Sequence, residues 1–336
     1  MSLMSIGDLA QNLMLRRQTT ALKLESQTAA KELSTGQASD TVRQLRGDIS
    51  RLAGLETTQT RLSAFQTAAK DAAMTTSAMQ QVLSNVSRMT QDIGNSLLSA
   101  GTLGETGTMN AVLQDADQRF SAVISSFNTR FGEESLFAGA ASDRPALASA
   151  EDILSALENA IIAAGAGTAE ATETAIDAWF EDPAGYESIA YVGGPPPGER
   201  MISPDDRVEI GFTALDPAIR NTVKALATAA LVHRENISAT PQARAQLSRR
   251  SGELLMQSQA ERAALAGRIG ISEARIDEAS TRNESESNAL QVLKYDLLGV
   301  DAYDAATRME TAQNQLETLY AVTARLSRLS LVDFLR

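Results

Sequence analysis

The sequence contains no cysteine and only one histidine and one tryptophan, and aromatic residues make up 4% of it. Without cysteine the chain has no disulfides, no thiolate nucleophile and no cysteine-based zinc site. The single histidine, His233, leaves almost no scope for a histidine-ligated metal. These absences exclude several classes of enzyme and metalloprotein, but they fit any compartment, including one reached by export.

Long apolar runs and excess positive charge are also absent. No run approaches the ~20 apolar residues that span a bilayer, and the opening MSLMSIGDLAQNLMLRRQ lacks the basic and apolar regions of a cleaved signal peptide. The formal net charge of -12 disfavours phosphate binding. We therefore expect no nucleic acid and no membrane as partners, and either a cytoplasmic location or export that leaves the chain uncut.

Proline is missing from both ends of the chain. All eight prolines lie between Pro145 and Pro241, and long helices tolerate proline badly. From Pro145 to Pro217 there are 14 acidic residues against 2 arginines, a charge of -12, whereas the remainder carries 28 acidic and 28 basic residues. The pattern predicts two neutral helical flanks around one acidic insert.

Apolar residues recur in alternating steps of three and four along both flanks. Of the thirteen positions from Leu55 to Leu97, ten are apolar and three are threonine; of the thirteen from Leu255 to Leu297, eight are apolar. Asn283 and Glu286 interrupt the second stripe, and such polar positions can fix helix register. We expect long helices over about 45–98 and from 247 onward, with a shorter one over 109–131, packed as an antiparallel rod.

The insert has the pattern of a small α+β unit. Ser149 with Asp152 three residues later resembles a capping box that opens a helix to about Ala163, and a second helix is expected over 169–180. The segments SIAYVGG, ERMIS and DRVEIGF are predicted as short strands separated by turns.

The two termini complete a mainly α fold. Residues 6–33 and 301–336 are predicted helices whose apolar stripes each need a partner, and the simplest partner is the other terminus. We therefore predict a long antiparallel rod built from both termini with an inserted α+β domain. The expected parts are a terminal coiled-coil core (1–42 and 299–336), a helical rod (43–144 and 218–298) and an acidic outer domain (145–217).

No arrangement of residues indicates catalysis or a cofactor. The sequence has no P-loop, no Rossmann glycine fingerprint, no GxSxG and no HExxH. His233 is expected to be structural, and the carboxylates of Asp205, Asp206 and Glu209 are expected in a solvated turn, although together they could bind Ca²⁺. The acidic pairs Glu133–Glu134 and Asp115–Asp117 are likewise expected to be solvated surface carboxylates. We predict no enzyme, no cofactor and no metal.

Four segments resemble the flagellin superfamily, and within it the hook-filament junction proteins. ELSTGQASD (32–40) is similar to the STG segment after the first helix of that superfamily, although the usual second Asp and Pro are missing, which implies a shorter loop. LFAGAASDRPAL (136–147), YVGGPPPGERMISPDDRVEI (191–210) and the ending ARLSRLSLVDFL (324–335) resemble junction-protein elements in the matching order.

The resemblance implies a structural, non-enzymatic component of the bacterial flagellum. Its paired termini would form an inner layer, and identical copies would form a ring between the preceding hook-associated protein and flagellin. Export would be uncleaved through the flagellar type III apparatus, with an export chaperone on the C-terminal helix. The predicted assembly residues are Leu15, Leu22, Leu316, Leu319, Leu326, Leu329, Leu331, Phe334 and Leu335.

Three other functional hypotheses stay open. One is a flagellin filament subunit, which the LFAGAASDRP segment argues against. Another is a soluble coiled-coil signalling or scaffold protein, in which the apolar ending would have no purpose. The third is a helical-bundle enzyme, which would need carboxylates or a histidine in a site that the sequence does not indicate.

Overall fold

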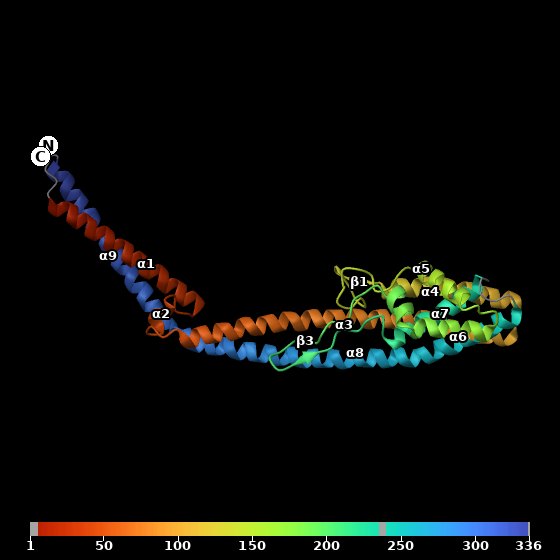
Figure 1. Ribbon diagram of the computed structural model, residues 1–336. Coiled ribbons are helices and arrows are strands. Elements are labelled where there is room, and N and C mark those ends of the chain that lie inside the picture. Colours follow the sequence, from red (N-terminus) through yellow and green to blue (C-terminus); the bar gives the residue numbers. More distant parts are fainter. Residues whose placement is uncertain (1–5, 235–239, 335–336) are drawn as a thin grey trace. The chain divides into compact units, whose positions relative to one another are not determined.

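The computed structural model describes residues 6–234 and 240–334, with the side chains of residues 10–234 and 240–326, and these ranges are mainly helical (Figure 1). The predicted fold class is confirmed. The elements in chain order are α1 (Ile6–Thr35), α2 (Thr41–Gln44), α3 (Ser50–Leu103), α4 (Thr106–Phe127), β1 (Arg130–Phe131), β2 (Glu134–Ser135), α5 (Ala150–Ala163), α6 (Ala169–Glu181), η1 (Pro183–Ala190), β3 (Arg200–Met201), β4 (Arg207–Val208), α7 (Pro217–His233), α8 (Pro241–Leu298) and α9 (Ala302–Phe334).

The chain divides into two compact units, residues 1–63 with 285–336 and residues 64–284. The first unit therefore combines N-terminal and C-terminal sequence, whereas the second is one continuous segment. The predicted division into an inner core, a rod and an outer domain at 145–217 stays a prediction.

In the first unit, the STG segment closes α1 and fastens it to the junction of α8 and α9. Gly36 has a positive φ of 68°, the left-handed conformation that commonly ends a helix. Its carbonyl accepts a hydrogen bond from the Val300 amide at 3.1 Å, and the Ala38 amide donates to the Leu298 carbonyl at 2.8 Å. These backbone bonds hold the start of α9 beside the end of α1.

In the second unit, the predicted stripes form the interior of α3 and α8. On α3 every stripe position from Ala69 to Leu97 is buried, and on α8 every position from Leu255 to Asn283 is buried. Beyond Asn283 the strict heptad fails, because Glu286 and Leu293 are exposed and their successors Ser287 and Lys294 turn inward. A straight helix of 3.6 residues per turn drifts from a 3.5-residue repeat, which accounts for this shift.

A larger apolar core lies at the other end of this unit, where α4, α5, α6 and α7 pack together (Figure 1). Ser149 caps α5 as predicted, since its hydroxyl accepts from the Asp152 amide at 3.1 Å. The shorter predicted helix ends at Phe127 rather than Phe131, and Phe131 is 44% exposed in β1. Its expected place on the buried stripe was wrong because the chain turns into the β1–β2 hairpin first.

The first expected strand, SIAYVGG, was also wrong in its first half. Residues 183–190 form the π-helix η1, which starts where the Asp182 side chain accepts from the Ala184 amide at 2.9 Å. Tyr186 is buried against Trp179 and Phe180 at ring-centroid distances of 6.4 and 5.2 Å. Burial of the large Tyr186 side chain favours the helical conformation of residues 183–190 and outweighs the strand propensity of the segment.

ERMIS and DRVEIGF do form an antiparallel pair, with Arg200 opposite Val208 and Met201 opposite Arg207. The hairpin lies on α3 and α8 through a small apolar cluster. Its members are Ile202, Val208 and Ile210 with Ala69, Ala72, Ile276 and Ala279. The buried Asn283 amide donates to the Ile202 carbonyl at 2.8 Å, which explains why a polar residue is tolerated in the stripe.

The LFAGAASDRPAL segment is fixed by backbone contacts to YVGGP. The Gly194 amide donates to the Ala138 carbonyl at 2.8 Å, and the Ala140 amide donates to the Pro195 carbonyl at 2.9 Å. Gly139 has a φ of 63°, and a Cβ atom there would lie 2.4 Å from the Gly194 carbonyl oxygen. The motif is therefore a close backbone junction that only glycine permits.

Candidate assembly surface

The two termini pair along nearly their whole described length, because α1 and α9 run side by side (Figure 1). On α1 the less exposed positions include Leu15, Leu22 and Ala29, at heptad spacing. On α9 the corresponding row contains Ala305, Met309, Ala312, Leu316 and Leu319. Four predicted assembly residues, Leu15, Leu22, Leu316 and Leu319, thus lie half-buried on the stripes along which the termini pair.

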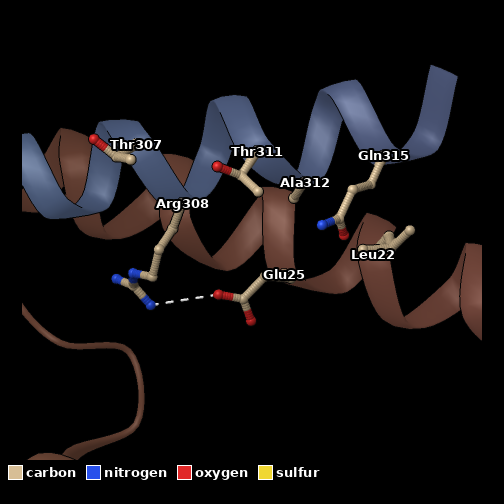
Figure 2. Close-up of a pocket in the computed structure, with 7 residues that line it drawn as sticks. All are labelled: Leu22, Glu25, Thr307, Arg308, Thr311, Ala312 and Gln315. Carbon is tan, nitrogen blue, oxygen red and sulfur yellow. Dashed lines mark hydrogen bonds and ion pairs between the residues drawn. The ribbon is translucent and has the colours of Figure 1, made fainter. Parts of the chain in front are cut away.

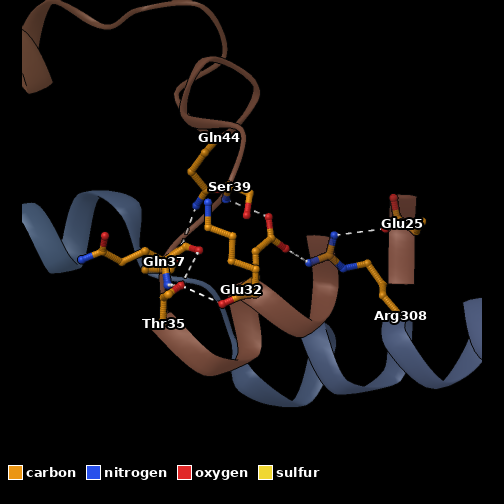
Figure 3. A network of polar contacts seen from close by, with 9 residues as sticks. Glu25, Glu32, Thr35, Gln37, Ser39, Gln44 and Arg308 are labelled. Atoms are coloured by element: carbon orange, nitrogen blue, oxygen red, sulfur yellow. Dashed lines mark hydrogen bonds and ion pairs between the residues drawn. The ribbon is translucent and has the colours of Figure 1, made fainter. Parts of the chain in front are cut away.

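A polar network ties this pair to the STG segment (Figure 3). Arg308 on α9 forms ion pairs with Glu32 and, at 3.4 Å, with Glu25 on α1. The Glu32 carboxylate also accepts from the Ser39 amide at 2.9 Å. Burial alone would raise the pKa of Glu32, but the hydrogen bonds from Ser39 and Arg308 outweigh it, so its pKa is lowered. The network therefore favours a charged Glu32 at neutral pH.

A small open pocket of about 190 Å³ lies next to this ion pair (Figure 2). Seven residues line it: Leu22, Glu25, Thr307, Arg308, Thr311, Ala312 and Gln315. Its only charged groups are one carboxylate and the guanidinium paired with it. The carboxylate is already paired with the guanidinium, and the mix of apolar and polar lining suits the packing of a side chain.

Large apolar side chains remain exposed on the outer faces of both terminal helices. On α1, Leu13, Met14 and Leu24 are 54%, 72% and 64% exposed. On α9 the exposed residues are Tyr303, Tyr320, Val322 and Leu326. Solvent-facing apolar groups in such number on two adjacent helices are typical of a surface that another protein covers.

The assembly residues predicted from the sequence do not include most of this outer surface. Of the predicted assembly residues with described side chains, only Leu326 lies on it, at 36% exposure. The heptad spacing identifies the stripe that meets the other terminus, but an apolar residue one or two positions away from that stripe falls on another face of the helix. Leu24, two residues after Leu22, could have indicated a second apolar face. The side chains of Leu329, Leu331 and Phe334, and Leu335 as a whole, lie outside the described residues.

Three of the acidic candidates form ion pairs with arginines. Asp206 forms an ion pair with Arg282, Asp115 pairs with Arg119 at 2.9 Å, and Asp117 lies 3.6 Å from Arg234. His233 occupies the last turn of α7.

Neither a metal site nor a membrane-spanning helix is found in the described ranges. Among these residues no group of three or more histidine, aspartate or glutamate side chains is placed to hold a metal ion. Within the same part of the chain no helix is long and apolar enough to cross a membrane.

The chain matches one family of known sequences, and its fold is similar to solved structures. Residues 253–335 match the family described as the bacterial flagellin C-terminal helical region. No curated protein matches the chain. The fold is similar to that of a protein assigned as a flagellar hook-associated protein from Vibrio parahaemolyticus, with 16% sequence identity and a TM-score of 0.52. That likeness covers 73% of this chain and 95% of the other.

The family match covers about a quarter of the chain and includes the whole of α9. The structural likeness concerns the fold. The family match confirms the predicted resemblance to flagellins over the C-terminal helical region, and the structural likeness agrees with the predicted fold.

Proposed function

We propose that this chain, which carries a flagellin-type C-terminal helical region, is a structural axial component of the bacterial flagellum and occupies the junction between hook and filament. The observation that carries the proposal is the pair of terminal helices, α1 and α9, which meet along one stripe and leave apolar side chains exposed on their outer faces. Neighbouring subunits would cover those faces.

The choice of the junction over the filament rests on the LFAGAASDRPAL segment. It connects the β1–β2 hairpin with α5, and it is held by backbone bonds to YVGGP on the far side of η1. The sequence resemblance associates this segment with junction proteins. A ring of copies would then contact the preceding hook-associated protein on one side and flagellin on the other.

Transport would follow from the same properties. The chain would be exported uncleaved through the flagellar type III apparatus, with an export chaperone covering the C-terminal helix until secretion. Terminal helices that become fully ordered only on assembly would prevent premature polymerisation, because the ordering entropy is offset only when neighbours bury the exposed stripe. No catalytic residue is needed for this role.

Electron microscopy of a deletion strain tests the proposal. We expect cells with hooks but no filaments, and flagellin released into the medium, with recovery on return of the gene. Filaments of ordinary length in the deletion strain would show that the chain is not the junction component.

The alternative of a filament subunit makes a different prediction. A filament subunit would polymerise alone into filaments of micrometre length, whereas a junction protein would not. A soluble scaffold protein would be absent from purified flagella, so its presence there also decides between an axial and a signalling role.

A further inference from the structure

A second apolar surface lies far from the termini in sequence, in a groove of about 620 Å³ between α3 and α8. Its floor is apolar: Ala73 is partly exposed, and beside it Ala69 and Ile276 are only 1% and 2% exposed because they also pack against the β3–β4 hairpin. Glu273, Asp277 and Glu284 line it from α8, against the single cation Lys70 from α3. Within the described ranges no ion pair neutralises these carboxylates, so the groove carries an excess of negative charge.

The groove is on the open flank of the helix pair. Successive residues of an α-helix point about 100° apart around its axis. Asp277 therefore points about 100° to one side of the buried Ile276, and Arg282 points about 120° to the other side. Arg282 pairs with Asp206 of the β3–β4 hairpin, so the hairpin covers the flank opposite Asp277. No hairpin residue lines the groove.

The dimensions of the groove suit a helix. Glu273, Asp277 and Glu284 follow the spacing i, i+4, i+11 on one edge of α8, a length of about 17 Å at ~1.5 Å per residue. That is about three turns of a helix laid along the groove, the way in which amphipathic helices bind apolar channels. An occupant must present apolar side chains to the floor and cations to the rim.

One strip of this same chain has that composition. Leu13, Arg17, Leu24 and Lys31 fall within about 40° of one another on α1 at ~100° per residue, on the side facing away from the stripe that meets α9. All four side chains are exposed, and no ion pair involves Arg17 or Lys31 in the part of the chain that the structure describes. The first three share the i, i+4, i+11 spacing of the groove carboxylates.

The exposed apolar residue of the β3–β4 hairpin fits less well. Met201 is 42% exposed on the β3–β4 hairpin, but Glu199 and Glu209 are exposed on the same two segments and would bring like charge to the rim. Like charges placed face to face in an interface are strongly unfavourable.

We propose that the groove of one copy binds the outer strip of α1 from a second copy, with Leu13 and Leu24 on the apolar floor and Arg17 and Lys31 against the carboxylates. The inference rests on the proposed function, which requires copies to assemble. The contact joins two different surfaces, the groove of one copy and the strip of another. In each pair one copy therefore keeps a free strip and the other a free groove, so that further copies can add to form a ring or a helical array.

Charge exchange tests this contact in flagella purified from the bacterium that encodes the chain. We expect Arg17→Glu with Lys31→Glu to lower incorporation at least about tenfold, because like charges would meet at the rim. Asp277→Lys with Glu284→Lys should have a similar effect, and the four substitutions together should restore incorporation. Arg16→Glu with Lys23→Glu changes the net charge equally on a neighbouring face of α1 and should retain most of it.

Cross-linking gives a second readout, and the absence of native cysteine keeps it free of background. Oxidation of flagella that contain both Leu24→Cys and Ala73→Cys chains should yield a covalent dimer. Ala30→Cys with Ala73→Cys should yield none, because Ala30 lies about 120° from Leu24 around α1.

The outcomes separate the two proposals. If the unmodified chain is absent from purified flagella, the proposed function is wrong and this contact falls with it. If the unmodified chain is present but the Arg17 and Lys31 reversal has no effect, or the two cysteine pairs cross-link equally, the groove contact alone is wrong.

Discussion

Glu32 and Arg308 join the two ends of the chain through one buried carboxylate. The Glu32 side chain is only 7% exposed, and besides Arg308 it binds the Ser39 amide in the loop between α1 and α2. The Glu25 contact with the same guanidinium is longer, at 3.4 Å, and its carboxylate is 47% exposed. Burial and the number of hydrogen bonds make Glu32 the more important partner.

Substitution of Glu32 by Gln keeps the shape and removes the charge. We expect the free energy of unfolding of the α1–α9 pair to fall by about 1–2 kcal/mol, because a hydrogen-bonded charge pair is lost. Helix melting followed by circular dichroism would measure it. Glu25→Gln is the matched control and should change stability by less than about 0.5 kcal/mol; an equal effect of both would contradict the distinction.

The same carboxylate predicts a pH dependence. Because the folded pKa of Glu32 lies below its ordinary value of 4.5, its contribution is present above that pH and is lost as the pH falls through the lowered folded pKa. Titration of the helix-melting midpoint from pH 6 to pH 3 should therefore show a loss of stability that is smaller in Glu32→Gln. A loss of the same size in both proteins would exclude Glu32 as a source.

Gly139 tests the backbone junction of the LFAG segment. In Gly139→Ala the new Cβ would meet the Gly194 and Pro195 carbonyl oxygens at 2.4 and 2.6 Å, and we expect a loss of about 2 kcal/mol or more in the free energy of unfolding. Gly165 has a similar φ of 66° but nothing within 4 Å, so Gly165→Ala should cost only about 1 kcal/mol. Denaturant unfolding of both variants compares the clash with the conformational cost alone.

Helices were predictable as elements because periodicity and proline distribution act locally. The stripes of α3 and α8 followed directly from their apolar spacing, and Ser149 fixed the start of α5. Elements decided by distant contacts were not predictable: η1 forms because Tyr186 is buried, and Phe131 leaves the stripe because a hairpin starts. On the assembly surface, the heptad count found Leu15 and Leu22, which face the other terminus, and missed the outer residues Leu13 and Leu24.

Arg262 shows how three helices are held at one level. Its buried guanidinium donates to Thr90 on α3, Thr222 on α7 and Ser258 on α8 at 2.7–2.8 Å, and burial lowers its pKa to about 10. Each hydroxyl also donates to a carbonyl of its own helix. The hydroxyls can therefore lose the arginine without becoming unpaired, whereas the arginine depends on all of them.

This asymmetry predicts a pair of outcomes. Thr222→Val should lower the free energy of unfolding by about 1–2 kcal/mol, because a buried cation loses an acceptor. Arg262→Met should change the free energy of unfolding by no more than about 1 kcal/mol relative to the unmodified protein. In a chain that already carries Arg262→Met, Thr222→Val should have little further effect on this free energy. Denaturant unfolding in a double-mutant cycle measures the coupling; simple additivity would contradict it.

At the scale of the whole molecule, charge and stability are divided between the units. Residues 1–63 with 285–336 contain 13 acidic and 13 basic residues, so the net charge of -12 belongs to residues 64–284. The neutral unit is also the less well packed, since the only buried residues described in α1 and α9 are Ala29, Glu32, Ala305 and Ala312. A neutral, weakly packed pair of termini can associate while the acidic unit keeps free copies apart.

The sparse packing predicts fast amide exchange at the ends of the free protein. In dilute monomer we expect roughly the first 40 and last 40 residues to exchange much faster than α3, α7 and α8, because few buried contacts oppose local opening. Hydrogen–deuterium exchange with mass spectrometry would measure this. Strong protection of the termini in the monomer would contradict ordering on assembly.

The central claim is that the chain joins the flagellum through its terminal helices, and removal of Ser327–Arg336 tests it most directly. Electron micrographs should be taken of a deletion strain that makes only the shortened chain, beside the same strain with the full chain. The account predicts hooks without filaments, with the shortened chain folded and secreted into the medium. Filaments of normal length on those hooks would contradict it.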